Sequence, residues 1–270
     1  MSSLEADSPA GVVIAAGSTT ARPYPRVRIW VSVLIAGLIA GFTSWLIGEA
    51  IHGRFGPPEV IRISKSSGGT LSNPEIQKLS VAQRAAQTFE ATLTFGSLGA
   101  VLGLALGLAG AFARGSARSA LKAAVVGSLL GGAAGYALTK VMLPIYFRVL
   151  DPDTNDLIVG IMIQVVISGA IGAAGGVAFG IGLGDRSRFV RAVIGGLLGA
   201  VAGALFYEMI GAIAFPSDKI SDPISLTWAT RLFARFAVMT FASAGVAFVA
   251  LDQVKEKKAI SRLVSEEHPS

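Results

Sequence analysis

The sequence has no cysteine and only two histidines, His52 and His268. Without cysteine the chain can form neither a disulfide bond nor a thiolate metal site, and its composition carries no signal about the redox compartment. His52 falls in a predicted loop and His268 in the C-terminal tail, so we expect neither to act as a base or a metal ligand inside a helix. These absences argue against thiol chemistry and against a catalytic pair of serine and histidine.

Charge is also scarce. Charged residues make up 15% of the 270 positions, whereas soluble proteins carry about 25%. Hydrophobic residues make up 52%, and the mean hydropathy is +0.63. The apolar residues form continuous runs of roughly 20 residues, the length that a helix needs to cross a hydrocarbon core of about 30 Å, and they do not alternate as strands would. The sequence therefore predicts an all-α fold, a polytopic membrane helix bundle with six transmembrane helices: Ile29–Ala50, Thr88–Phe112, Ala123–Phe147, Leu157–Leu183, Phe189–Phe215 and Ala229–Leu251.

The predicted six-helix transmembrane domain covers residues 29–253 and is flanked by two tails. Residues 1–28, rich in Ser, Ala, Pro and Thr, predict a disordered cytoplasmic tail, and residues 254–270 predict a charged cytoplasmic tail. A long non-cytoplasmic loop is predicted over residues 51–87. Within this loop, the polar residues just before Pro74 are typical of a helix start, so we expect an amphipathic helix to lead into the second span.

The connections between spans two and three and between spans four and five are basic, and they carry Arg114, Arg118, Lys122, Arg186, Arg188 and Arg191. Positive residues favour the cytoplasmic side, so we expect both the N-terminus and the C-terminus to be cytoplasmic. The five Lys and Arg residues between positions 51 and 84 oppose this orientation, but the basic sites on the other side outweigh them. The formal net charge of +6 then indicates contact with anionic lipid headgroups and not with nucleic acid. We expect a multi-pass protein of a bacterial plasma membrane, the cell inner membrane.

The 33 glycines recur at spacings of four inside the apolar runs, and their pattern predicts an internal repeat. Gly195 lies 68 positions after Gly127 in a matching run, and Gly172 lies 73 positions after Gly99. The simplest account is three tandem two-helix repeats. Glycines four apart share one helix face, so they also predict a glycine zipper that packs helices closely; a dimer interface or a sliding face used in gating is the alternative. The predicted packing positions are Gly37, Gly41, Gly99, Gly103, Gly107, Gly127, Gly131, Gly135, Gly172, Gly176, Gly180, Gly195, Gly199 and Gly203.

A polar cluster is predicted near the non-cytoplasmic ends of the spans, where Gln164 also lies, and its members are Glu49, Glu90, Lys140, Glu208, Arg231 and Arg235. An ionisable group at membrane depth costs at least about 2.5–3.5 kcal/mol, so such groups usually face the bundle and pair. Lys140 and Glu208 occupy equivalent repeat positions with opposite charges, which predicts a direct ion pair between them. The alternative is a solvated vestibule that binds an ion or a small solute.

No catalytic, cofactor-binding or metal-binding motif is present in the sequence. Stretches such as "GAAGGVAFGIG" match phosphate-loop spacings only loosely, and inside an apolar run they carry no phosphate-site meaning. We therefore expect no enzyme activity and no cofactor. The sequence favours a non-enzymatic structural or assembly component of a membrane, and the alternative is a small-solute or ion transporter or channel that uses the polar cluster. The expected partners are the lipid bilayer and a membrane protein or a second copy of the chain, with no nucleic acid.

Overall fold

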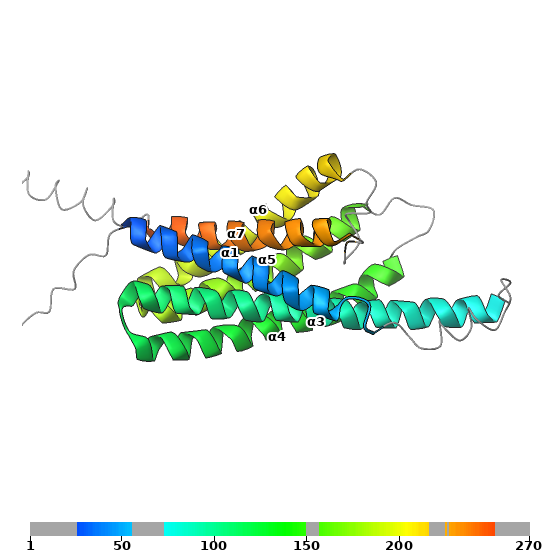
Figure 1. Cartoon of the computed structure of the whole chain (residues 1–270), viewed down its shortest axis with the longest axis horizontal. Coiled ribbons are helices and arrows are strands. Elements are labelled where there is room, and N and C mark those ends of the chain that lie inside the picture. The colour runs from blue at the N-terminus through cyan, green and yellow to red at the C-terminus, as the bar shows by residue number, and fades with distance from the viewer. Residues whose placement is uncertain (1–25, 56–72, 150–156, 216–224, 226, 252–270) are drawn as a thin grey trace, which may run out of the picture.

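The computed structural model describes residues 26–55, 73–149, 157–215, 225 and 227–251 (Figure 1). Within these residues it contains no strand, and its helices are α1 (Arg26–Ile51), α3 (Asn73–Arg114), α4 (Ala117–Val149), α5 (Leu157–Leu183), α6 (Arg186–Ala214) and α7 (Trp228–Leu251). All six helices are long and apolar enough to cross a membrane, so the structure confirms the predicted all-α class and the six spans. The predicted tail 254–270 and most of the predicted tail 1–28 lie outside the described residues.

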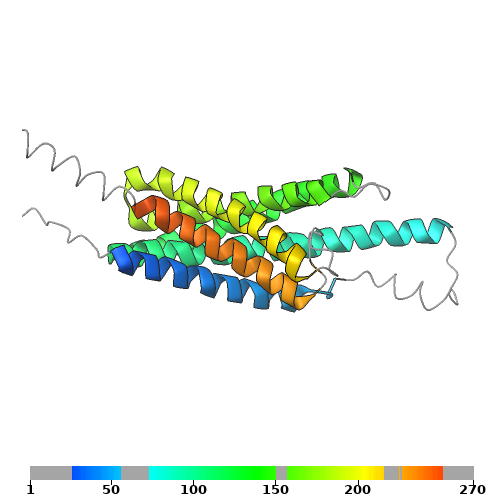
Figure 2. The same cartoon turned by 90° about the horizontal axis from the view of Figure 1, so that it is seen from above.

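Helix α3 is longer than the span predicted within it. It begins at Asn73, so residues 73–87 of the predicted loop are helical. Pro74 occupies the first turn, where its missing N–H needs no partner and its fixed φ suits a helix start. The 42 residues of α3 correspond to about 63 Å, roughly twice the hydrocarbon thickness. Its N-terminal part therefore extends past the other helices (Figures 1 and 2).

Two glycines end helices and create tight hairpins. Gly115 follows α3 with a φ of 75°, and Gly184 follows α5 with a φ of 66°, a backbone region that only glycine enters without strain. Their N–H groups donate to the carbonyl oxygens of Ala111 at 2.9 Å and of Gly180 at 3.0 Å. Each helix is thereby capped, and the next helix starts within two residues of the glycine and runs back antiparallel.

The six helices form a closed bundle (Figure 2). α1 packs between α3 and α7, α6 packs between α5 and α7, and α4 lies against α3 and α5. α3 and α5 also contact each other, which places them in the middle of the bundle. The start of α1 and the end of α7 lie at the same end as the two glycine hairpins (Figures 1 and 2).

On α4 most of the buried residues are small, whereas large apolar residues lie on the outer face. Its outer face exposes Leu121 and Leu129, which are 69% and 68% accessible. Lipid tails are as apolar as leucine, so these side chains meet a suitable solvent while small residues let the helices approach. The buried face of α4 consists mainly of Ala120, Ala123, Ala124, Gly127, Gly131, Gly135 and Thr139.

Glycine allows α3 and α4 to touch backbone to backbone. A Cβ atom at Gly99 would overlap the carbonyl group of Gly131, and one at Gly103 would overlap the carbonyl group of Gly127. Side-chain atoms at these positions would separate the helices and remove the dispersion contacts between them. The same close approach occurs between α5 and α6 and between α6 and α7.

The glycines that the repeat makes equivalent have different neighbours. Gly131 of α4 faces α3, the preceding helix, whereas Gly199 of α6 faces Phe241 of α7, the following helix. α6 turns a different glycine, Gly196, toward α5. Gly37 of α1 also faces α7. The threefold repeat thus stays a prediction from the sequence, since the helices that it relates are packed differently.

Candidate functional site

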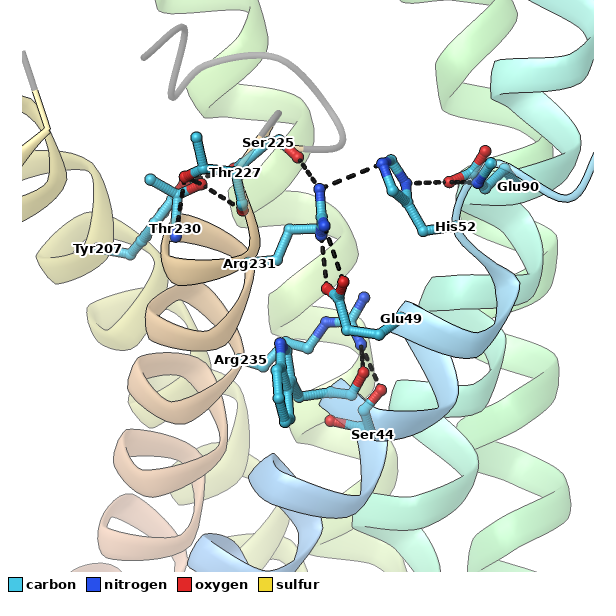
Figure 3. A network of polar contacts seen from close by, with 12 residues as sticks. Ser44, Glu49, His52, Glu90, Tyr207, Ser225, Thr227, Thr230, Arg231 and Arg235 are labelled. Atoms are coloured by element: carbon cyan, nitrogen blue, oxygen red, sulfur yellow. Dashed lines mark hydrogen bonds and ion pairs between the residues drawn. The ribbon is translucent and has the colours of Figure 1, made fainter. Parts of the chain in front are cut away.

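Four of the six predicted polar residues lie where α1 ends and α7 begins (Figure 3). Glu49 comes from the last turn of α1, and Arg231 and Arg235 come from the beginning of α7. The two arginines are four residues apart and share a helix face, so both reach toward α1. Glu90 of α3 joins through a histidine. We call the connected set the Arg231 network: Glu49, His52, Glu90, Ser225 and Arg231.

Arg231 is the centre of this network. Its Nε donates to Oε1 of Glu49 at 2.6 Å, and its Nη2 donates to Oε2 at 2.8 Å. Nη1 donates to the carbonyl oxygen of Ser225 at 3.0 Å. Paired bonds of this kind are the strong form of an arginine–carboxylate contact. With Arg231 only 7% exposed, the pair ties α1 to α7 and to the chain just before α7.

His52 connects the ion pair to α3. Its Nε2 lies 3.3 Å from Nη1 of Arg231, and its Nδ1 hydrogen-bonds to Glu90. Arginine can only donate, so Nε2 is the acceptor and the Nδ1–H group donates to the carboxylate. The N–H of Gly53 also donates to Glu90, at 3.4 Å. The network therefore joins the ends of α1 and α7 to the middle of α3.

Arg235 lies one turn further along α7 and has no carboxylate within ion-pairing distance among the described residues. Its Nη1 donates to the main-chain carbonyl oxygens of Ser44 and Trp45, the latter at 3.3 Å. Gly48 makes room for the guanidinium, because a Cβ atom there would overlap it. Arg235 is 6% exposed. It therefore carries a positive charge into the bundle and rests on the backbone of α1.

A cavity of about 40 Å³ lies beside both arginines, between α3, α5 and α7. A water molecule needs about 10–15 Å³ of such space, so the cavity has room for a few waters or one small ion. Its polar side chains come from three different helices and from the segment before α7. We call it the Arg235 cavity, and it is lined by Thr94, Phe95, Leu98, Gln164, Ser168, Ser225, Arg231, Ala234, Arg235 and Val238.

Lys140 and Glu208 lie apart from this network. Lys140 is exposed on α4, and its Nζ lies 5.7 Å from the centre of the Tyr136 ring. Glu208 is 8% exposed on α6, and its Oε1 has no hydrogen-bond partner in the described structure. No ion pair joins the two residues, both of which the structure describes. The predicted direct pair is absent because Lys140 turns outward, whereas Glu208 turns inward.

Sequence reasoning did not select several residues that build the site. Gly48, Thr94, Ser168 and Ser225 lack a distinguishing pattern, since small and hydroxylated residues are common in apolar helices. His52 is assigned only to a loop, although its position three residues after Glu49 could have suggested a contact near the same helix end. Only the fold brings these residues to the two arginines.

Comparison with known proteins gives no relative: no family model, no curated protein and no solved structure matches the chain. The features that bear on function are therefore the packing of the helices and the polar groups at one end of the bundle.

Proposed function

We propose that this chain is a non-enzymatic structural or assembly component of a membrane. The observation that carries the proposal is the direct backbone contact between neighbouring helices, for example at Gly99 and Gly131. Helices that meet in this way cannot slide or separate without losing their dispersion contacts. The Arg231 network adds a polar tie between α1, α3 and α7 at one end. A bundle held together in this way is better suited to a structural role than to a function that requires large helix movements.

The N-terminal part of α3 supports an assembly role. Residues 73–87 extend past the other helices and are not needed to cross the bilayer (Figure 1). Ile76 and Val81 are 48% and 67% exposed there. We propose that this segment contacts a membrane-protein partner or a second copy of the chain.

We further propose a location in a bacterial plasma membrane with both termini in the cytoplasm. Arg114, Arg186 and Arg191 lie at the end of the bundle where α1 starts and α7 finishes, which supports this orientation under the positive-inside rule. The absence of native cysteine allows a clean test. A cysteine at Ala117, which is exposed at the start of α4 in the same hairpin, should react with a membrane-impermeant maleimide only after cells are opened, whereas one at Phe55 should react in intact cells. The reverse labelling pattern would show that both termini lie outside the cytoplasm.

The structural proposal is tested by reconstituting the purified chain into liposomes and measuring the flux of ions and small solutes. We expect flux no greater than in empty liposomes, and we expect cross-linking in membranes to give a species larger than the 27.7 kDa chain. Cysteine cross-linking at Val81 should form that species, whereas the lipid-facing control position Leu129 should not. Flux above background, or a chain that stays monomeric at both positions, would contradict the proposal.

A small-ion transporter is the second candidate, and the Arg235 cavity is the observation that favours it. Neither Lys140 nor Glu208 lines the cavity, and the cavity volume of about 40 Å³ corresponds to a local site. The liposome measurement separates the two candidates, because transport requires flux and Glu208→Gln should alter that flux only if Glu208 lies on the path.

A further inference from the structure

We infer that the Arg235 cavity binds one small monovalent anion, such as chloride. Arg235 gives the cavity a positive wall, since its guanidinium borders the cavity and is 6% exposed. Among the described residues its hydrogen bonds go to neutral carbonyl oxygens, and no carboxylate lies within ion-pairing distance of it. A monovalent anion in the cavity would give this buried cation a counter-charge.

The cavity also carries hydrogen-bond donors on α3 and α5. Thr94 and Ser168, which are 6% and 2% exposed, line it together with Gln164. Hydroxyl and amide N–H groups can donate to an anion, so these side chains can add hydrogen bonds to those of the guanidinium.

The size and surroundings of the cavity also suit a small anion. Its volume of about 40 Å³ gives room for an ion of halide size. Phe95, Leu98 and Val238 form the apolar part of the lining. Apolar walls lower the local dielectric constant, which strengthens the attraction between the guanidinium and an anion.

The binding of chloride is tested by thermal unfolding of the full-length protein in detergent. Sodium chloride is titrated against sodium gluconate at constant ionic strength, because gluconate is too large for the cavity. A ligand that binds only the folded state raises the Tm as its concentration exceeds the Kd. We expect the Tm of the wild type to rise with chloride and then to saturate, with bromide acting similarly. An equal Tm in chloride and gluconate would show that the cavity holds water only and would overturn the inference.

Arg235→Met keeps most of the side-chain volume and removes the charge. We expect it to lose the response to chloride, with a midpoint raised about tenfold or more. If Arg235 served only to hold α7 on α1, this variant would lower the Tm equally in both salts and leave the chloride response intact, which would refute the site. Lys140→Met removes an exposed cation from α4 and is the matched control, expected to respond like the wild type.

Ser168→Ala keeps the inference testable if Arg235→Met does not fold. It removes one donor from the cavity lining without touching the arginines, so we expect an unchanged Tm in gluconate and a higher chloride midpoint. An unchanged midpoint would count against the site. The inference does not depend on the structural role proposed above, since chloride binding without chloride flux supports both, and chloride flux would favour the transporter while retaining the site.

Discussion

Adding one methyl group to Gly99 should loosen the contact between α3 and α4. A Cβ atom at this position would overlap the carbonyl group of Gly131, which belongs to a helix backbone and cannot rotate away. The two helices would have to separate by roughly an ångström, and a gap of that size removes about a quarter to a half of the dispersion energy of the atoms that it parts. Overpacking of this kind typically costs about 1–3 kcal/mol.

Gly96 provides the matched control for Gly99→Ala. It lies on the same helix and faces the same partner, but its nearest neighbour would be Cβ of Tyr136 at 3.4 Å, an ordinary contact. Replacing glycine by alanine favours the helix by about 1 kcal/mol at either position, so this gain cancels between the two variants. The difference between Gly99→Ala and Gly96→Ala should therefore equal the steric penalty of about 1–3 kcal/mol.

Thermal unfolding in detergent, followed by circular dichroism, measures this difference. For a chain of this size 1 kcal/mol corresponds to about 2–4 °C, so Gly99→Ala should unfold roughly 2–12 °C below Gly96→Ala. Gly96→Ala should match or exceed the wild type. If both variants shift the Tm by the same amount, direct backbone contact does not hold α3 against α4, and the reasoning about the glycine faces is refuted.

Four further single variants test the polar end of the bundle. Glu49→Gln should lower the stability by about 3–5 kcal/mol because it takes the carboxylate away from the buried Arg231, and Arg231→Gln should cost less because the side chain of Glu49 is 26% exposed. In a double-mutant cycle by chemical unfolding the double variant should lose less than the sum, and additive losses would contradict the pair. Gly48→Ala should displace the flexible guanidinium of Arg235 and not the backbone. We therefore expect a small fall in Tm and a weaker effect of chloride on the Tm. An unaltered effect of chloride would argue against an anion site at the Arg235 guanidinium. Tyr207→Phe removes a hydroxyl that hydrogen-bonds at 2.6 Å to the segment before α7, and should cost about 0.5–1.5 kcal/mol in the same unfolding assay; no loss would mean that this segment is not held there.

Much of the fold could be predicted because hydropathy acts residue by residue. Leu157–Leu183 was predicted to be a span and is helix α5 with the same bounds. The start of α3 at Asn73 follows from the local preference of Pro74 for the first helical turn. The extension of α3 beyond its apolar run is harder to predict from the sequence, since a polar amphipathic segment is compatible with either a loop or a helix.

The candidate site could be predicted only in part. Glu49 and Arg231 stand out in the sequence because charge inside an apolar run is expensive and calls for a partner. The partner of each charged residue could not be predicted in the same way. The repeat predicts an ion pair between Lys140 and Glu208, whereas the bidentate ion pair in the structure joins Glu49 and Arg231. Matching positions in a repeat do not ensure matching neighbours.

The sequence by itself determined that the chain crosses a membrane as six helices, with small residues available for close packing and charges near one set of helix ends, because each of these properties depends on local composition. Only the tertiary structure decided which way each helix turns about its axis. That rotation is set by the fit of all six helices together, so Gly131 faces the preceding helix and Gly199 faces the following one. For the same reason Lys140 turns outward while Arg235 is buried beside a cavity without a carboxylate partner in the described structure.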